Sequence, residues 1–276
     1  MDSRKVKENI WKALLWFSAV ITVFMLVFIL GFIFLKGFRK ISPTFLTADY
    51  SPSGDGGILP MIVATLYSVL LSIVVATPIG ILAAVYLQEY AKQGKLVKII
   101  RFATESLSGI PSIVYGLFGS IFFVDVLGFG YSILAGSLTV SIIILPVIIR
   151  TTEESLKSVP KFYREASLGL GATKFQTLYK VIVPSALPGV LSGVILSIGR
   201  VVGESAAVLL TAGTVAKMAT SIMSSSRTLT VHAYLVTKEA GDIEQAAAVG
   251  IVLIVIILVL NTIAKLITKK FSKANY

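Results

Sequence analysis

Six stretches of this chain are apolar over the length that a helix needs to cross a lipid bilayer. A hydrocarbon core about 30 Å thick requires about 20 consecutive apolar residues in a spanning helix. Helices of this kind satisfy their own backbone groups, which lipid cannot do. The predicted spans are Ala13–Leu35, Ile62–Leu87, Ser106–Val124, Ile133–Ile149, Leu187–Leu210 and Ala246–Ile267. The sequence therefore predicts an all-α integral membrane protein with six transmembrane helices.

Composition excludes a substantial soluble domain. Apolar residues make up 55% of the 276 residues and charged residues 14%, far from the balance of ordinary globular proteins. The longest polar stretch is shorter than 40 residues. The basic start and the first apolar run resemble a signal peptide, but the run exceeds 20 residues and no small-x-small cleavage site precedes Lys36. We therefore expect a retained first helix.

Basic residues predict the orientation of the bundle, because lysine and arginine gather on the cytoplasmic side of membrane proteins. With the N-terminus inside, 18 of the 25 lysines and arginines fall in cytoplasmic segments and six in outside loops. Both termini are therefore expected to be cytoplasmic, in a multi-pass protein of the cell membrane. The net charge of +11 fits attraction to anionic lipid headgroups. It predicts no nucleic-acid partner, because the basic residues form no aromatic-interleaved patch.

Several classes of enzyme lack the residues they need. The chain has no cysteine, no glycine-rich phosphate loop ending in Lys-Ser or Lys-Thr, and a single histidine, His232. It therefore predicts no catalytic residue, metal site or cofactor of its own. We expect His232, in the outside loop Thr211–Gln245, to be a solvated or interfacial side chain.

The fifth apolar run contains two charges that a spanning helix does not need for folding. Arg200 lies near its middle, where a charge costs about 2.5–3.5 kcal/mol on the insertion scale, and Glu204 follows four residues later. Such a spacing places both side chains on one helix face, where they can pair. The planar guanidinium also matches tetrahedral oxyanions. Arg200, Glu204 and Ser205 are candidate residues of a solute pathway; the alternatives are a purely structural ion pair or an arginine that snorkels to the interface.

Small residues recur every four positions in the same run. Gly189, Gly193 and Ser197 form one series, and Gly199, Gly203 and Ala207 form another. This spacing lets membrane helices approach closely. We expect the fifth helix to lie inside the bundle and not against lipid.

The third apolar run is interrupted by a helix breaker. Pro111 follows Gly109-Ile110; proline removes a backbone donor and restricts the residue before it. Irregular backbone at membrane depth is tolerated where it lines a cavity or is buried in protein. Glu105 and Ser108 beside the break are weaker candidates for the pathway. The alternative is that the break is only a kink.

The longest polar loop contains a short helix signal. Glu165 suits the first turn of a helix, where free amide groups favour negative charge, and Gly171 can adopt the left-handed conformation that ends one. Pro184 and Pro188 then mark where the next span can begin. The predicted element is a short helix over Glu165–Gly171, followed by a return to the membrane.

This loop resembles the cytoplasmic EAA loop of ABC-importer permeases. The resemblance rests on Glu165-Ala166, on Gly171, and on Val181-Ile182-Val183-Pro184 at the expected spacing. It implies that the short helix docks into a partner ATPase, with Glu165, Ala166, Gly171 and Ala172 as coupling residues. Ser167 stands where that loop usually has alanine, and it is also small. An ordinary amphipathic loop helix is the alternative.

The core of the chain resembles the permeases of the phosphate-specific transport (Pst) system, from about Gly56 to Lys270. The matching motifs are Gly199–Ser205, Ser108–Phe118, and Gly56-Gly57-Ile58-Leu59-Pro60 with Ala64-Thr65-Leu66. The short N-terminus and the ending with Asn261 are more similar to the A type (PstA) than to its C-type paralogue. The resemblance implies the type I ABC-importer (MetI-like) permease fold.

The same resemblance implies a function and a set of partners. The expected protein is a non-enzymatic permease subunit that moves inorganic phosphate by alternating access. Its implied partners are a PstC-like second permease, a PstB-like ATPase dimer, in which ATP is hydrolysed, and an extracytoplasmic PstS-like phosphate-binding protein. An ABC permease for another oxyanion, an ion-coupled secondary transporter and a membrane subunit without a pathway remain alternatives. The expected domains are residues 1–56 (first helix and outside loop), 57–270 (core permease, with the EAA loop at 151–186) and 271–276 (cytoplasmic tail).

Overall fold

The computed structural model describes residues 3–51 and 56–273, and every regular element in those ranges is helical. The prediction of an all-α protein is confirmed. The elements, in chain order, are α1 (Ser3–Gly37), η1 (Phe38–Lys40), α2 (Pro43–Thr47), α3 (Leu59–Val85), η2 (Tyr86–Tyr90), α4 (Lys95–Ser108), α5 (Ser112–Gly119), η3 (Ser120–Val126), α6 (Ile133–Ser158), α7 (Lys161–Gly169), α8 (Lys174–Thr177), η4 (Leu178–Ile182), α9 (Val183–Gly203), α10 (Ala206–Thr211), α11 (Leu229–Leu235), η5 (Val236–Ala240) and α12 (Ile243–Lys273).

Five helical stretches of the described chain are long and apolar enough to cross a membrane. They contain α1, α3, α6, α9 and α12, and so match five of the six predicted spans. The third predicted span, Ser106–Val124, is wrong as a continuous helix. In its place α4 and the α5–η3 segment meet at an angle of 99° around Gly109–Pro111. The chain therefore has six membrane segments only if this bent pair counts as one.

The fifth predicted span, Leu187–Leu210, is also interrupted. Helix α9 ends at Gly203, and Glu204 is extended, with φ −77° and ψ 123°, before the short helix α10 begins. The Oε1 atom of Glu204 accepts a 3.1 Å hydrogen bond from the backbone N–H of Ala207. A side chain that binds nearby backbone in this way competes with helix continuation. The polar pair inside the apolar run thus marks a helix break.

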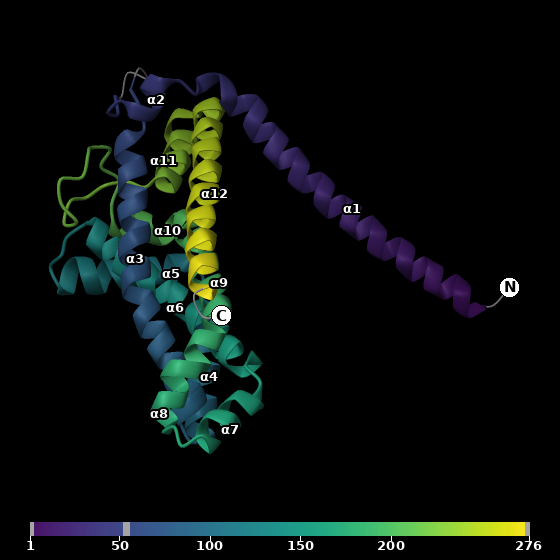
Figure 1. Ribbon diagram of the computed structural model, residues 1–276. Coiled ribbons are helices and arrows are strands. Elements are labelled where there is room, and N and C mark those ends of the chain that lie inside the picture. The colour runs from purple at the N-terminus through teal and green to yellow at the C-terminus, as the bar shows by residue number, and fades with distance from the viewer. Residues whose placement is uncertain (1–2, 52–55, 274–276) are drawn as a thin grey trace.

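The core of the bundle is formed by α3, α6 and α9, which pack along one another (Figure 1). A Cβ atom at Gly189 or Gly193 would collide with Ser155 or Thr151 of α6. The close packing predicted for this series is therefore confirmed. In the second series Ala207 is buried, but no described atom lies within 4 Å of the Cβ position at Gly199 or Gly203, so these two glycines are not closely packed within this chain.

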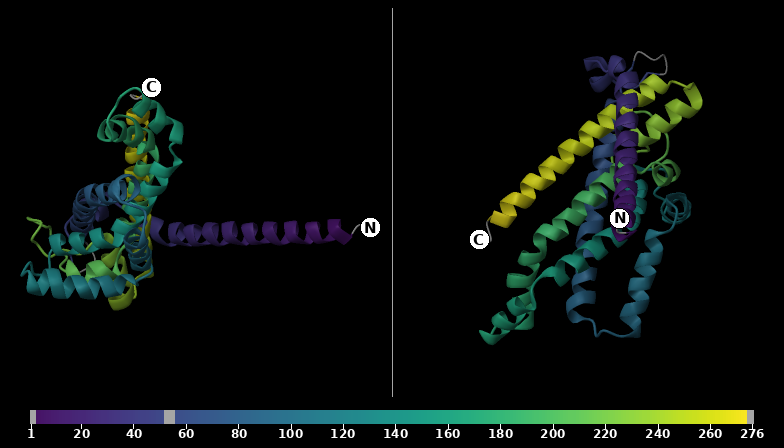
Figure 2. Two further views of the ribbon diagram at one scale, coloured as in Figure 1. Left: turned by 90° about the horizontal axis from the view of Figure 1, so that it is seen from below. Right: turned by 90° about the vertical axis from the view of Figure 1, so that its right-hand side faces the viewer.

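Helix α1 leaves the bundle at one end and lies apart from the rest of the structure (Figures 1 and 2). At that end Gly37 crosses the start of α12 so closely that a Cβ atom would lie 2.5 Å from the backbone of Ala248. Side chains such as Trp11 and Trp16 are exposed along the length of α1. The C-terminal end of α1 and the N-terminal end of α12 both lie at the end of the molecule that carries α2 (Figure 1).

The only histidine is buried, so its predicted exposure is wrong. His232 lies in α11 with 0% of its surface exposed, and its ring meets that of Tyr50 edge to face at 5.6 Å. The guanidinium of Arg227 stacks over the same tyrosine ring at 4.5 Å. Burial, and secondarily the charge of Arg227, lowers the pKa of His232 from 6.5 to about 4. The residue is therefore a neutral core side chain at neutral pH.

Burial of neutral His232 predicts a loss of stability in mild acid. The unfolded chain takes up a proton as the pH falls through 6.5, whereas the folded chain resists protonation until about pH 4. Stability is therefore present above 6.5 and falls by about 3 kcal/mol as the pH drops to 4. Melting of the detergent-solubilised protein should show a smaller acid-dependent fall in Tm for His232→Leu than for the unmodified chain. Equal falls in both proteins would contradict this assignment.

Candidate functional site

Arg200 lies in the last turn of α9, on an exposed face of the bundle. The C-terminal end of a helix carries a partial negative charge that favours a cation there. Among the described side chains, none forms an ion pair or hydrogen bond with the guanidinium. Arg200 is thus a permanent positive charge inside an apolar span, and no described residue is its anionic partner.

The predicted ion pair between Arg200 and Glu204 is absent from the described structure. Because α9 ends at Gly203, the four-residue spacing no longer places the two side chains on one helix face. The carboxylate of Glu204 caps α10 instead, through Ala207. Its backbone carbonyl accepts a 2.9 Å hydrogen bond from the hydroxyl of Thr230 at the start of α11. Glu204 therefore holds the break in place and leaves Arg200 free.

The two broken helices meet each other. Ser205, the half-buried residue before α10, completes the break after Glu204. Helix α10 packs against α5, and a Cβ atom at Gly116 of α5 would lie 2.9 Å from Cα of Ala207. The hydroxyl of Tyr115 donates a 2.7 Å hydrogen bond to the carbonyl of Leu107, across the α4–α5 bend. Irregular backbone from two spans is thereby brought to one region, as expected where membrane helices line a pathway.

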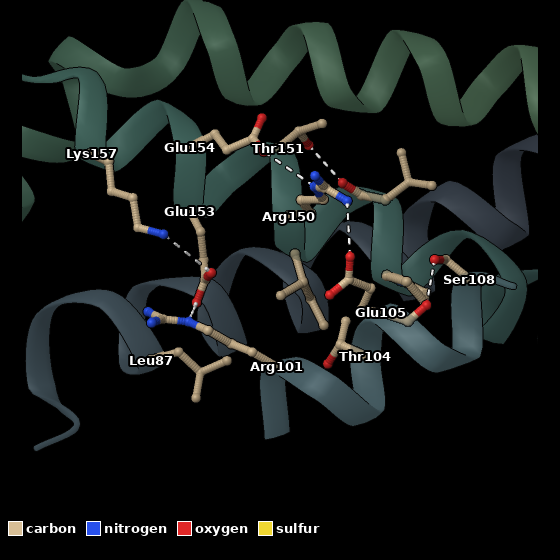
Figure 3. A pocket seen from close by; sticks show the side chains of 13 residues that line it. Leu87, Arg101, Thr104, Glu105, Ser108, Arg150, Thr151, Glu153, Glu154 and Lys157 are labelled. Atoms are coloured by element: carbon tan, nitrogen blue, oxygen red, sulfur yellow. Dashed lines mark hydrogen bonds and ion pairs between the residues drawn. The ribbon is translucent and has the colours of Figure 1, made fainter. Parts of the chain in front are cut away.

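A cavity of about 450 Å³ lies between α4 and α6, and Glu105 and Ser108 line it (Figure 3). Glu105 approaches Arg150 of α6 at 3.9 Å. The hydroxyl of Ser108 donates to the carbonyl of Glu105 at 2.7 Å. The two predicted residues therefore lie together, but Arg200 is not among the residues that line this cavity. The pathway candidates form two separate groups.

Most of the charged side chains around this cavity are not among the site residues predicted from the sequence. The side chain of Glu153 in α6 is 8% exposed. It forms ion pairs with Arg101 of α4 at 3.2 Å and with Lys157 at 3.8 Å. Arg150 pairs with Glu154 at 3.1 Å. The spacing of four residues in both α6 pairs was a readable signal, whereas the contact from Arg101 required knowledge of how α4 folds back onto α6. The pair between Arg101 and Glu153 joins the amphipathic helix α4 to α6.

The predicted loop helix is present, with shifted bounds. Helix α7 spans Lys161–Gly169, so Glu165 is in its middle and not in its first turn as predicted. The helix starts earlier because Pro160 precedes it with a φ of −55°, close to the helical value. Gly171 has a φ of +86°, which confirms the left-handed conformation expected there. Ala166 and Ala172 are half-buried, and Glu165 is exposed.

The loop around α7 and α8 is built to present apolar side chains outward. Ser167 binds the hydroxyl of Thr177 at 2.9 Å, and this contact ties α7 to the end of α8. Thr173 and Gln176 form a reciprocal capping box that starts α8. Large side chains then remain exposed at the tip of the molecule, including Phe162, Leu170, Phe175 and Tyr179. An exposed apolar patch of this kind is typical of a protein interface.

The sequence from residue 76 to residue 273 matches the family model described as the inner membrane component of binding-protein-dependent transport systems. The chain belongs to this family. It is 34% identical to the probable ABC transporter permease protein YqgI of Bacillus subtilis, over 95% of each chain. It is 38% identical to the phosphate transport system permease protein PstA of Pasteurella multocida, over 76% of this chain and 75% of the relative. The PstA protein of Mycobacterium leprae is 36% identical, over 76% and 70%.

Solved structures confirm the fold. A chain of a bacterial alginate ABC transporter superposes with a TM-score of 0.68 at 15% identity, over 96% of this chain and 98% of that one. A chain of the MetNI methionine ABC transporter superposes with a TM-score of 0.59 at 20% identity, over 78% and 94%. The MetI-like permease fold expected from the sequence is therefore confirmed. The family and the relatives are named for transport and not for an enzymatic reaction. The protein is a multi-pass component of the inner membrane.

Proposed function

We propose that this chain is the PstA-type permease subunit of an ATP-driven importer for inorganic phosphate. Several relatives named as phosphate transport permeases are 32–38% identical to it over most of its length. The observation that carries the choice of an anion is Arg200, a permanent cation in a membrane span without a carboxylate partner among the described residues. Such a charge is costly unless something pairs with it. A phosphate oxyanion offers two oxygens to the guanidinium fork.

An importer of another oxyanion is the second candidate. The relative from Bacillus subtilis is named only as a probable ABC transporter permease, without a substrate. Arg200 alone does not distinguish phosphate from sulfate, because both present tetrahedral oxygens. The proposed anion pathway runs past Arg200 and the backbone break at Glu204 and Ser205. Glu105 and Ser108 border its cytoplasmic exit through the cavity between α4 and α6.

The proposed assembly contains four kinds of subunit. We infer that a second, PstC-like permease faces the side of α9 on which Arg200 and Gly203 are exposed. A PstB-like ATPase dimer hydrolyses ATP, and a PstS-like protein delivers phosphate from outside. Glu165, Ala166, Gly171 and Ala172 belong to the α7–α8 segment that docks into the ATPase. We retain residues 57–270 as the core permease, 1–56 as the first helix with its outside loop, and 271–276 as the tail, of which 274–276 lie outside the described residues.

Uptake by the purified complex tests this function. The chain and its three partners are reconstituted in lipid vesicles that contain ATP, with the binding protein and radiolabelled phosphate outside. We expect accumulation of phosphate that requires ATP and is not inhibited by a hundredfold excess of sulfate. Inhibition by sulfate, together with accumulation of labelled sulfate, would favour the second candidate. Uptake by the chain without the ATPase would contradict the ATP-driven mechanism.

The proposed orientation places both termini and the α7–α8 segment in the cytoplasm. The absence of cysteine makes single-cysteine labelling unambiguous. Thr220→Cys, in the exposed loop that follows α10, should react with an impermeant thiol reagent in intact cells. Gly94→Cys, in the exposed loop before α4, should react only after the membrane is opened. Labelling of Gly94→Cys from outside would contradict the proposed orientation, and with it the docking of an ATPase from the cytoplasm.

A further inference from the structure

Arg164 makes four polar contacts from the inner face of α7. Its Nη2 and Nε atoms donate to the carboxylate of Glu89, at 2.6 Å and 3.4 Å. Nη1 donates to the carbonyl of Val159 at 3.2 Å, and Nη2 also donates to the carbonyl of Leu156 at 3.1 Å. A planar guanidinium can make this set of bonds, whereas the single ammonium of lysine cannot.

These contacts join three elements that are distant in the sequence. Glu89 lies in η2, which continues α3. Leu156 lies near the end of α6, and Val159 directly follows it. The carbonyls at a helix end have no partner within the helix, and a cation nearby is favoured. Arg164 therefore satisfies free carbonyl groups at the end of α6 and also binds Glu89 in the segment that continues α3.

The ion pair between Arg164 and Glu89 is largely buried. The side chains of Arg164 and Glu89 are 24% and 18% exposed, whereas Glu165, the next residue along α7, is exposed. The two residues also line a cleft of about 220 Å³ that includes Leu168 and Leu178. Fully exposed ion pairs contribute little, but a bidentate pair with further hydrogen bonds restricts geometry as well as adding energy. Helix α7 thus has one face anchored to the bundle and one face free.

We propose that Arg164 is the positioning residue through which movement of α7 is transmitted to α3 and α6. The inference rests on the proposed docking of α7 into an ATPase. A displacement of α7 pulls the guanidinium, which acts directly on the ends of α3 and α6. These two helices form the centre of the bundle together with α9, which carries Arg200. Arg164 acts through other residues and does not contact the transported anion.

Two variants separate transmission from docking. Glu89→Gln removes the ionic part of the link but leaves the bonds from Arg164 to the α6 carbonyls. Arg164→Gln removes both. In the reconstituted complex, each should keep the ATPase bound, while phosphate transported per ATP hydrolysed falls about three- to thirtyfold. Lys92→Gln, an exposed charge without an ion pair among the described residues, is the matched control and should leave this ratio unchanged.

Restoring the link without the charges is the decisive test. Glu89→Cys with Arg164→Cys, in a chain that otherwise lacks cysteine, provides two thiols, and cysteine-free partners keep the reaction specific. A bifunctional methanethiosulfonate reagent should restore transport per ATP, a monofunctional one should not, and dithiothreitol should reverse the effect. Failure to restore transport although mass spectrometry shows the cross-link would overturn the proposal and leave Arg164 as a helix cap.

The readouts distinguish this inference from the function on which it rests. If the unmodified chain does not bind the ATPase, the proposed docking is wrong. If the unmodified chain binds it and either single variant does not, Arg164 and Glu89 shape the docking surface, and transmission through them is contradicted. Retained binding with an unchanged transport ratio in both single variants contradicts the inference alone.

Discussion

Arg200→Gln should abolish ATP-driven phosphate uptake while the complex still assembles. The substitution removes the positive charge near the middle of the fifth predicted span. Arg200→Lys keeps the charge but loses the two-pronged hydrogen bond to an oxyanion. Because a hydrogen bond to a charged group contributes about 1.5–3 kcal/mol, we expect uptake to fall at least about tenfold. Initial rates in reconstituted vesicles measure both effects.

The absence of an Arg200–Glu204 pair among the described residues sharpens this experiment. If the two residues formed only a structural pair, neutralising both would restore activity, because no buried charge would stay unmatched. In the structure, Glu204 binds the backbone N–H of Ala207, and a glutamine can accept the same bond. The double variant Arg200→Gln with Glu204→Gln should therefore fold, assemble and remain inactive.

The matched control applies the same exchange at another site. Arg39→Lys changes an exposed arginine in η1, which follows the first helix, and we expect unaltered uptake. Recovery of uptake in the double variant to near the unmodified rate, at equal expression, would rule out Arg200 as an anion station.

Apolar length was sufficient to predict five spanning helices, but it did not predict the backbone breaks within the third and fifth predicted spans. Hydropathy counts residues along the chain, and it cannot register a backbone that changes direction. The break at Pro111 was readable because proline has a fixed backbone conformation. The break after Gly203 was not, because Glu204 ends the helix through a hydrogen bond to Ala207, whose geometry depends on the fold. The prediction of an ion pair failed for the same reason.

Contacts between elements that are distant in the sequence also could not be predicted from it. The motif around Glu165 identified the loop, and a single glycine correctly indicated a left-handed residue. Nothing in the local sequence indicated that Arg164 would meet Glu89, 75 residues earlier. The same holds for Arg101 and Glu153, and for buried His232. Each depends on which helix faces which, and one sequence without its tertiary packing does not specify that.

Substitution of Gly171 is expected to have the second large effect on transport. This position requires glycine because of its backbone conformation and not because of steric crowding. Its φ is +86°, and no described atom lies within 4 Å of the position that a Cβ atom would take there. Any loss on substitution therefore comes from the backbone. Alanine in this region costs about 1–2 kcal/mol, and proline, with φ fixed near −65°, cannot adopt it at all.

We therefore expect Gly171→Pro to insert in the membrane but to lose ATPase co-purification and ATP-driven uptake. Gly171→Ala should lose part of both. Gly169→Ala is the matched control: this glycine lies two residues earlier, inside α7, with equally open surroundings and without a positive φ. Alanine favours a helix by up to about 1 kcal/mol over glycine, so this variant should dock normally. A Gly171→Pro complex that assembles and transports at the normal rate would show that the turn after α7 does not position the ATPase dock.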